Sequence, residues 1–419
     1  FADVFEVRGM RRQRTGEPLG LTPWPDGAEL GYRGLDGVTR RLRLSCEPPP
    51  FDLAEATARF RLQLKAQESA SFALTFACLL DGHPPRQAGP RESLAARLAG
   101  VEAARARQAE VSTSHEQFNA WLTRSRSDLH MLVTDTPHGP YPYAGVPWFS
   151  APFGRDGIIT ALQVLWLDPG LARGVLSYLA ATQAGAMVGE QDAEPGKILH
   201  ETRRGEMAAL KEIPFGRYYG SVDATPLFIV LAGAYYERTG DLEFLQHLWP
   251  SIARALDWVD RYGDADGDGF VEYSSRTPRG LLHQGWKDSQ DAVFHADGRP
   301  AEGPIALCEV QGYAYAARQH GVRLATVLGK ADVARRLAGQ AEALRIQFER
   351  EFWLPERETY ALALDGEKEP CRVRTSNAGH ALFARIAAPD RAARLAAGLL
   401  GPDFFSGWGV RTVATGEAR

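Results

Sequence analysis

A short loop that ends in an arginine and an aspartate holds residue types suited to sugar chemistry. Residues 147–160 read PWFSAPFGRDGIIT, and an apolar pattern with helical spacing starts directly after Asp156. Asp156 therefore occupies the position expected for a helix N-cap. A guanidinium beside a carboxylate can also bind neighbouring hydroxyls of a sugar. The pattern predicts one of two roles for Arg155 and Asp156: an ion pair that caps a helix, or a sugar-binding pair.

Aromatic side chains are dense in the same loop. The aromatic residues of positions 134–156 are Tyr141, Tyr143, Trp148, Phe149 and Phe153. Such rings either form a small core or stack on the apolar face of a pyranose. We expect Trp148 or Phe149 to form a stacking wall beside a bound sugar.

The next long loop carries further polar residues that could reach a sugar. His200 and Glu201 lie within residues 185–221, and Asp223 follows them. His200 has no second ligand at metal-binding spacing, so we expect it to donate a hydrogen bond. Asp223 either caps the helix that begins near Thr225 or binds a sugar hydroxyl.

A third loop, residues 263–304, places an acid close to an indole in the run Trp286, Lys287, Asp288. An apolar neighbour raises the pKa of a carboxyl, whereas the Lys287 ammonium would lower it if it pointed inward. A raised pKa suits a general acid at neutral pH. Asp288 is therefore either a general acid or an aspartate of a surface loop.

The start of this third loop imitates a calcium-binding sequence. Residues 264–272 read DADGDGFVE, but Ser275 stands at the twelfth position, where a bidentate glutamate belongs. Turns rich in aspartate and glycine produce such runs on their own. We expect a tight turn here, and neither a metal nor another cofactor.

Composition argues against several classes of partner. The 419 residues carry a formal net charge of -4, which gives no electrostatic reason to expect binding to nucleic acid or to an anionic membrane. No apolar run is long enough to cross a bilayer, and no signal peptide is evident. The four cysteines are far apart, which favours a reducing, cytoplasmic compartment. None of these features indicates an oligomeric state.

The elements that must position these loops change from strands to helices along the chain. Alternating apolar residues up to about residue 90 predict an N-terminal β-sandwich. The clearest strand patterns lie at 28–33, 39–45, 60–64 and 71–76. A helix rich in Ala, Arg and Glu over residues 92–110 should link this region to the next.

From His115 onward the periodicity predicts helices in pairs. We expect an amphipathic helix near 118–133, followed by helices near 157–168, 171–184, 224–240, 241–262, 305–328, 331–353, 375–387 and 389–400. The 241–262 helix should be interrupted or restarted at Pro250. Long loops recur at every second connection, and this alternation favours an α/α toroid over a plain bundle or solenoid.

Five segments together resemble a known family. Runs 147–160, 200–206, 220–226, 285–289 and 404–412 resemble bacterial amylo-α-1,6-glucosidase-type proteins, which are relatives of the glucosidase half of glycogen debranching enzyme. The resemblance implies a β-sandwich before an (α/α)6 barrel, and an inverting glycoside hydrolase that acts on α-glucosidic linkages of an α-glucan or oligosaccharide. It implies that Asp288 is the general acid. The substrate contacts that we expect are Trp148, Phe149, Arg155, Asp156, His200, Glu201, Asp223 and Trp286.

The chain departs from the family pattern at its C-terminal end. The family's catalytic base is expected in a segment that would follow Arg419, because Glu206, Glu272 and Glu309 read more easily as structural residues. We therefore expect an incomplete barrel that does not turn over alone. Two alternatives stay open: a related barrel glycosidase for trehalose, mannosylglycerate or rhamnosides, and an inactive carbohydrate-binding homologue. The predicted divisions are a sandwich over 1–91, a helical linker over 92–113 and the barrel domain over 114–419.

Overall fold

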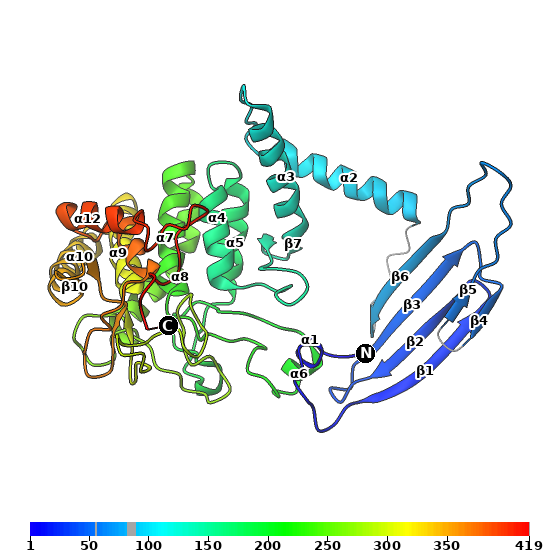
Figure 1. The fold of residues 1–419 in the computed structure, drawn as a ribbon, viewed down its shortest axis with the longest axis horizontal. Coiled ribbons are helices and arrows are strands. Elements are labelled where there is room, and N and C mark those ends of the chain that lie inside the picture. The colour runs from blue at the N-terminus through cyan, green and yellow to red at the C-terminus, as the bar shows by residue number, and fades with distance from the viewer. Residues whose placement is uncertain (55–56, 82–88, 419) are drawn as a thin grey trace. The chain divides into compact units, whose positions relative to one another are not determined.

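The computed structural model describes residues 1–54, 57–81 and 89–418, and the chain divides into two compact units (Figure 1). The first unit comprises Phe1–Gln108 and Arg204–Gly216, and the second comprises Ala109–Arg203 and Arg217–Arg419. This division differs from the predicted one, because the long helix α2 (Pro90–Arg107) lies with the first unit. No pattern in the sequence indicated that a segment from the middle of the chain joins that unit.

An antiparallel sheet with strand order β1-β2-β3-β6 forms the body of the first unit. Its strands are β1 (Glu17–Trp24), β2 (Gly27–Arg33), β3 (Thr39–Glu47) and β6 (Ala73–Leu80), and β4 (Asp52–Ala54) pairs with β5 (Thr57–Arg59) in a separate ribbon. The prediction of an antiparallel β domain is confirmed, but the described residues do not form the two large packed sheets of a sandwich. The strand expected at 60–64 is wrong: residues 60–64 form no strand, and Leu62 and Leu64 are exposed.

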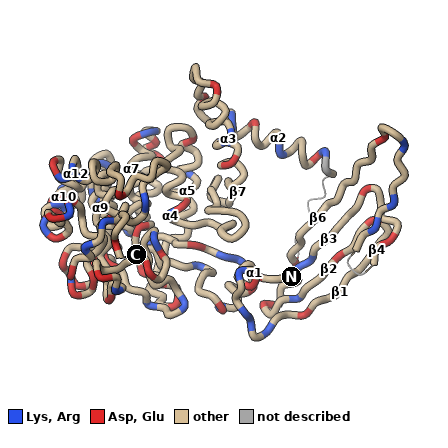
Figure 2. The backbone as a smooth tube through the Cα atoms, in the orientation of Figure 1, with Lys and Arg blue, Asp and Glu red and all other residues tan. Residues whose placement is uncertain are grey.

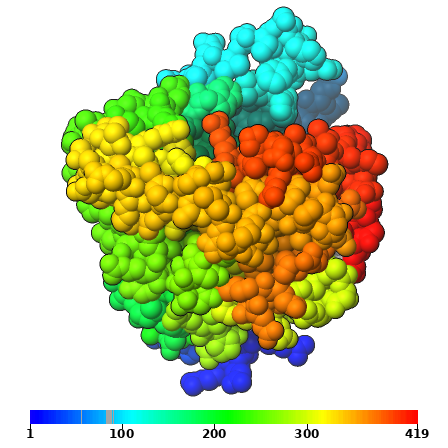
Figure 3. Space-filling view, turned by 90° about the vertical axis from the view of Figure 1, so that its left-hand side faces the viewer, coloured from blue at the N-terminus to red at the C-terminus, as the bar shows by residue number. Residues whose placement is uncertain are grey.

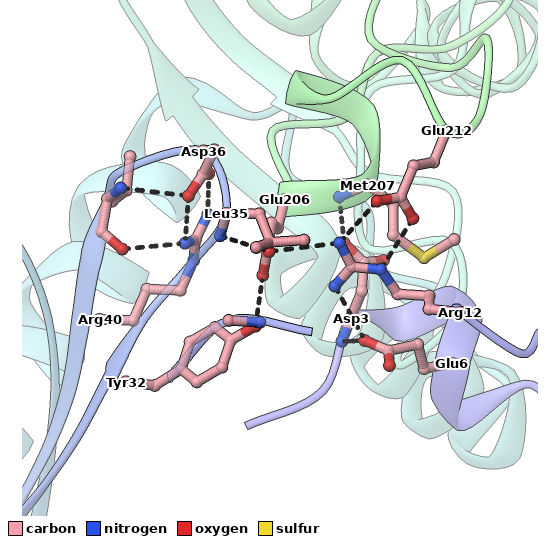
Figure 4. A network of polar contacts seen from close by, with 12 residues as sticks. Asp3, Glu6, Arg12, Tyr32, Leu35, Asp36, Arg40, Glu206, Met207 and Glu212 are labelled. Carbon is pink, nitrogen blue, oxygen red and sulfur yellow. Dashed lines mark hydrogen bonds and ion pairs between the residues drawn. The ribbon is translucent and has the colours of Figure 1, made fainter. Parts of the chain in front are cut away.

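A buried polar network within the first unit holds segment Arg204–Gly216, which we call the inserted segment (Figure 4). Arg12 donates to both carboxylate oxygens of Glu212 at 2.7 Å, and its Nη2 also reaches Glu206 Oε1 at 3.2 Å. Glu206 accepts two more hydrogen bonds, from the Tyr32 hydroxyl and from the backbone N–H of Leu35. The Arg12 and Glu206 side chains are only 2% and 6% exposed. We call these five residues the Arg12 clamp.

A small apolar core accompanies the clamp. It joins the short helices α1 (Val4–Val7) and α6 (Glu206–Ala209) through the buried side chains of Phe5 and Met207, and Phe215 stacks on Phe5 with ring centroids 5.6 Å apart. The inserted segment is therefore an integral part of the first unit.

Paired helices make up the second unit, as the sequence predicted. The helices are α3 (Glu116–Leu132), α4 (Gly154–Val164), α5 (Pro169–Ala181), α7 (Ala224–Thr239), α8 (Leu242–Arg261), α9 (Cys308–Val327), α10 (Ala331–Glu351), α11 (His380–Phe383) and α12 (Pro389–Leu399), with 3-10 turns η1 (Gly189–Gln191) and η2 (Ser376–Gly379). The short strands are β7 (Val133–Thr136), β8 (Gly139–Pro142), β9 (Ala306–Leu307), β10 (Trp353–Leu354), β11 (Thr359–Tyr360) and β12 (Ala363–Leu364). Short and long connections alternate, and in Figure 1 the long loops gather at one end of the helices.

The packing of this unit centres on α7 and α9. Helix α7 is apolar around most of its circumference and is buried from Ala224 to Gly233, and it packs against α4, α5, α8 and α9. Helices α8 and α10 bury only one face, so each covers a buried neighbour. Helix α8 runs through Pro250 without a break, so the predicted interruption there is wrong. Helix α3 forms as predicted but buries none of its residues.

Positive and negative side chains are interspersed over the residues that the structure describes, with no strongly one-signed region among them. Lys and Arg alternate with Asp and Glu along both units (Figure 2). Figure 3 shows the C-terminal segment lying beside residues near 360–380, where the N–H of Ser376 donates to the carbonyl of Thr412. Among the described residues, no helix is both long and apolar enough to cross a membrane.

Candidate active site

The start of helix α4 is built against the loop that carries His200. The Gly154 N–H donates to the His200 carbonyl at 2.8 Å, and a Cβ on residue 154 would lie 1.9 Å from the carbonyl oxygen of Leu199. Only glycine permits this approach. The N-cap is Phe153, and Asp156 is the third residue of the helix, so the prediction that Asp156 caps α4 is wrong.

Arg155 brings three loops together. Its Nη1 donates to Asp223 Oδ2 at 3.0 Å and to the carbonyl oxygen of Gly285 at 2.9 Å. Asp223 is fully buried and also accepts from the Ser221 hydroxyl at 2.5 Å. Although Asp223 stands at the N-cap position of α7, its side chain makes no capping hydrogen bond. The structure thus resolves the open choice for Asp223 against a cap: its carboxylate fixes Arg155.

Asp156 lies beside this cluster with an unusually free carboxylate. Among the described residues, the only hydrogen-bond donor to its carboxylate is its own backbone N–H. Burial raises the pKa of Asp156; the positive charge of Arg155 opposes the rise, and the negative charges of Asp223 and Asp288 add to it. The negative charges of Asp156 and Asp288 therefore act on one another.

Asp288 itself is exposed, so the apolar shielding expected from Trp286 does not form in this structure. The centroid of the Trp286 ring lies 6.0 Å from the centroid of the His380 ring and 5.0 Å from Lys287 Nζ. Its Nε1 is buried without a partner among the described residues. Trp286 therefore presents an unsatisfied donor next to the residue that we assigned as acid.

His200 is a buried neutral imidazole at the edge of the cluster. Burial lowers the pKa of His200 to about 3, and the positive charges of Arg155, Arg203 and Lys197 act in the same direction. Its Nδ1 is buried and has no partner among the described residues. A neutral ring with one unsatisfied nitrogen suits a hydrogen bond to a hydroxyl group.

Glu201 is engaged within the protein rather than free for a sugar. It accepts from Arg203 Nε at 2.7 Å, and Arg203 Nη1 donates to the carbonyl of Trp148 at 2.9 Å. Glu201 thus orients the aromatic loop through Arg203. Within that loop Trp148 and Phe149 are 36% and 44% exposed.

The other aromatic residues of that loop have structural positions. Tyr141 is fully buried and donates its hydroxyl to the Phe153 carbonyl, and Phe153 is buried as well. Tyr143 packs against the helical core. The predicted aromatic set therefore divides into core residues and the two exposed rings of Trp148 and Phe149, which remain candidates for stacking.

A buried carboxyl near the cluster was noticed in the sequence but not assigned to the site. Glu309, in the first turn of α9, accepts from Asn377 Nδ2 at 2.9 Å and is 1% exposed. Burial raises the pKa of Glu309 to about 7, although Asn377 and the charge of Lys287 oppose the rise. Burial also lowers the pKa of Lys287 to about 8. A lone glutamate in the apolar run 306–310 was the available sequence signal.

Two groups of possible metal ligands, one of three aspartates and one of a histidine and two acids, have the spacing of metal sites, but members of each are already engaged by other residues. Lys368 Nζ lies 2.8 Å from Asp266 Oδ2 and 2.7 Å from Asp268 Oδ2, so its ammonium occupies the place of a cation in the calcium-like loop. In the second group, His295 Nε2 lies 3.1 Å from Asp365 Oδ2, and Glu369 pairs with Arg299. Neither donor set favours a metal in its present arrangement.

Comparisons with known proteins match the two ends of the chain to two different domain families. Residues 1–75 match the N-terminal domain of some glycogen debranching enzymes, and residues 154–419 match the mannosylglycerate hydrolase MGH1-like glycoside hydrolase domain. No curated protein sequence matches the chain.

Similar folds occur among solved glycosidase structures. A GH78 family rhamnosidase of Bacillus sp. GL1 aligns with a TM-score of 0.55 at 15% identity, over 92% of this chain and 38% of the rhamnosidase. A GH63 mannosylglycerate hydrolase from Thermus thermophilus, in complex with Tris and D-glycerate, aligns with a TM-score of 0.53 at 14% identity, over 70% of this chain and 83% of that one. These identities show the fold alone. Since the MGH1-like model spans more than half of the 419 residues, the chain belongs to the MGH1-like glycoside hydrolase family.

Proposed function

We propose that the chain supplies the sugar-binding residues and the general acid, Asp288, of an α-glucosidase that acts on an α-glucan or oligosaccharide in the manner of an amylo-α-1,6-glucosidase. The observation that carries the proposal is the position of Arg155, whose guanidinium joins Asp223 to the Gly285 carbonyl. This tie brings Asp156 and the Asp288 segment into one electrostatic cluster.

Each member of the cluster has a distinct proposed role. Asp156 accepts hydrogen bonds from hydroxyls of the non-reducing-end sugar, because its carboxylate is otherwise unused. His200 and the Trp286 Nε1 supply further polar contacts, and Trp148 or Phe149 stacks on the ring. Arg155, Asp223 and Glu201 position these groups. Asp288 protonates the leaving oxygen as the glycosidic bond breaks.

Inversion is the stereochemistry that we propose, with water attacking from the face opposite the leaving group. It requires a second carboxylate about 6.5–9.5 Å from the acid. Glu206 and Glu272 are already engaged, by Arg12 and by Lys368, so we assign neither as the base. For the fold we propose that the helix pairs belong to an (α/α)6 ring, which the pairing of α7 with both α4 and α9 supports.

A second candidate is a hydrolase of mannosylglycerate or a related mannoside. The match of residues 154–419 to the MGH1-like domain favours it. The two candidates differ in the sugar that Asp156 would hold, because glucose and mannose differ at one ring hydroxyl. An inactive homologue would bind such a sugar and release no product.

The test is a binding titration of the chain with glucose, mannose, rhamnose and trehalose, followed by tryptophan fluorescence. Glucose should bind most tightly, and Asp156→Asn should weaken binding at least about tenfold, since a charged hydrogen bond contributes about 1.5–3 kcal/mol. Asp332→Asn, at an exposed position of α10, is the matched control and should bind normally. A preference for mannose would support the second candidate, and no sugar binding would overturn both.

A further inference from the structure

The segment that follows α12 forms a small hairpin with a tryptophan at its tip. Phe405 and Val410 form an isolated antiparallel bridge, and the Ser406 Oγ accepts from the N–H groups of Trp408 and Gly409 at 3.3 and 3.2 Å. Gly407 has a φ of +92°, which a residue with a side chain rarely adopts. The turn is thus well defined, and it presents the Trp408 side chain outward.

The base of this hairpin is tied to the candidate active site. Lys287 Nζ donates to the carbonyl oxygen of Thr412 at 2.7 Å, and the N–H of Ser376 donates to the same oxygen at 3.1 Å. Lys287 directly precedes Asp288, so this hydrogen bond joins the hairpin to the segment of the proposed acid. Thr375 and Val413 form a further bridge, which fixes the strand leaving the hairpin.

Packing does not explain why a tryptophan occupies position 408. Its side chain is 99% exposed, whereas the next most exposed tryptophans, Trp121 and Trp166, are 64% and 50% exposed. Phe405 and Val410 beside it are also exposed, at 43% and 44%. Apolar surface gathered on a defined turn typically marks a contact with a ligand or a partner.

We infer that Trp408 is a stacking platform for a pyranose ring on the leaving-group side of the scissile bond. This inference rests on the proposed function of Asp288. A general acid protonates the leaving oxygen, so the leaving sugar must lie on the side of Asp288. The hairpin is fixed to that segment through Lys287, and an indole offers the flat apolar surface on which a pyranose stacks. A small charged leaving group such as a glycerate would gain nothing from such a surface, so the site favours an oligosaccharide.

The experiment compares a monosaccharide with a linear gluco-oligosaccharide by titration calorimetry. Trp408→Ala should weaken oligosaccharide binding about tenfold and leave glucose binding unchanged, and Trp408→Phe should recover part of the loss. Trp166→Ala, which removes an exposed tryptophan from the short α4–α5 connection, is the control and should alter neither affinity.

The outcomes separate this inference from the proposed function. If Trp408→Ala and the unchanged chain bind the oligosaccharide with equal affinity, the stacking platform is overturned. The proposed function still stands in that case if glucose binding depends on Asp156. The absence of binding to either sugar overturns both. Concentration-dependent association in sedimentation velocity that Trp408→Ala abolishes would also overturn the inference, because a second copy of the chain would then cover the indole.

Discussion

At the residue scale, Asp156 separates a ligand contact from a structural role. The Asp156 carboxylate caps no helix, and burial raises its pKa because the charged form loses contact with water. Asp156→Asn should therefore leave the free energy of unfolding unchanged or slightly higher, as urea unfolding at pH 7 can measure. A helix cap would instead cost about 0.5–2 kcal/mol when removed. A loss of that size, with unaltered sugar affinity, would return Asp156 to a capping role.

Asp288 is the residue on which the proposed chemistry depends. In an active protein, Asp288→Asn should retain substrate binding and lower kcat on a natural glucan by about 10²–10⁴-fold, which is the usual contribution of general acid catalysis. The loss should be much smaller with a glycosyl fluoride, whose leaving group scarcely needs a proton. An unchanged kcat on the glucan would remove Asp288 from the mechanism, and Asp291, which accepts from Ser289 Oγ, would be tested next.

The sequence predicted the residue types of the site better than their partners. The Arg155 and Asp156 pair and Asp223 were found because each stands at a recognisable helix start. Whether each aspartate caps its helix depends on contacts across the fold, such as the one between Asp223 and Arg155, and local pattern does not encode those. The pairing of Glu309 with Asn377 was missed for the same reason.

At the element scale, the Arg12 clamp should stabilise the inserted segment 204–216. Glu206→Gln would leave the Arg12 charge with less compensation in a buried position, and breaking a buried ion pair typically costs about 3–5 kcal/mol. Hydrogen exchange should therefore accelerate in residues 1–12 and 204–216. The control is Glu29→Gln, which removes the partner of Arg41 and Arg43 on the exposed face of the sheet and should have little effect. Equal exchange in the two variants would show that the clamp is dispensable.

Lys368 allows a prediction about the calcium-like loop. Its ammonium contacts Asp266, Asp268 and Glu272 at 2.7–2.8 Å, so these carboxylates need no metal for charge balance. Thermal unfolding with and without a chelator should superimpose for the unchanged protein. Lys368→Met should lower Tm, because three neighbouring carboxylates would then repel one another. A large loss of Tm on adding chelator to the unchanged protein would contradict this view.

The helices were predictable because their periodicity is local, and the exceptions have physical causes. Proline inside a helix removes a backbone hydrogen bond, but Pro250 is exposed and the opposite face of α8 is held in the core by Leu245, Leu248 and Ile252. The apolar spacing in α3 predicted the helix correctly. It did not predict burial, because Trp121 and Phe118 are exposed. The alternating pattern at 60–64 did not produce a strand, because alternation alone does not supply a pairing partner, and none is present among the described residues.

At the scale of the whole molecule, the order of the chain and the division into units do not coincide. The chain passes between units after residues 108, 203 and 216. Segment Arg204–Gly216, which belongs to the first unit, is flanked in the sequence by Glu201 and Tyr218 of the second unit. These two residues form an antiparallel bridge, which brings the two ends of the segment together. Domain boundaries inferred from composition alone assume a continuous segment for each unit, and this assumption fails wherever a loop folds into another unit.

The stability of the second unit should depend on pH through Glu309. Its pKa rises from 4.5 to about 7 on burial, so the folded protein binds a proton more readily than the unfolded chain. The associated stabilisation is fully present below pH 4.5 and is lost as pH rises to about 7, by up to about 3 kcal/mol at 1.36 kcal/mol for each pKa unit. The groups whose charges couple to it are Lys287, Asp223, Cys308, Tyr273 and Tyr313.

Glu309→Gln should remove this part of the pH dependence, because glutamine can still accept from Asn377 but does not titrate. The free energy of unfolding between pH 5 and 7.5 can be followed by tryptophan fluorescence, since only Trp24 of the nine tryptophans lies outside the second unit. This range stays below the region in which Lys287, with a pKa of about 8, adds stability as pH rises. Glu243→Gln, at an exposed position of α8, should retain the slope of the unchanged protein. If Glu309→Gln and Glu243→Gln show the same slope, Glu309 is already ionised at pH 5 and the buried carboxyl is stabilised in its charged form.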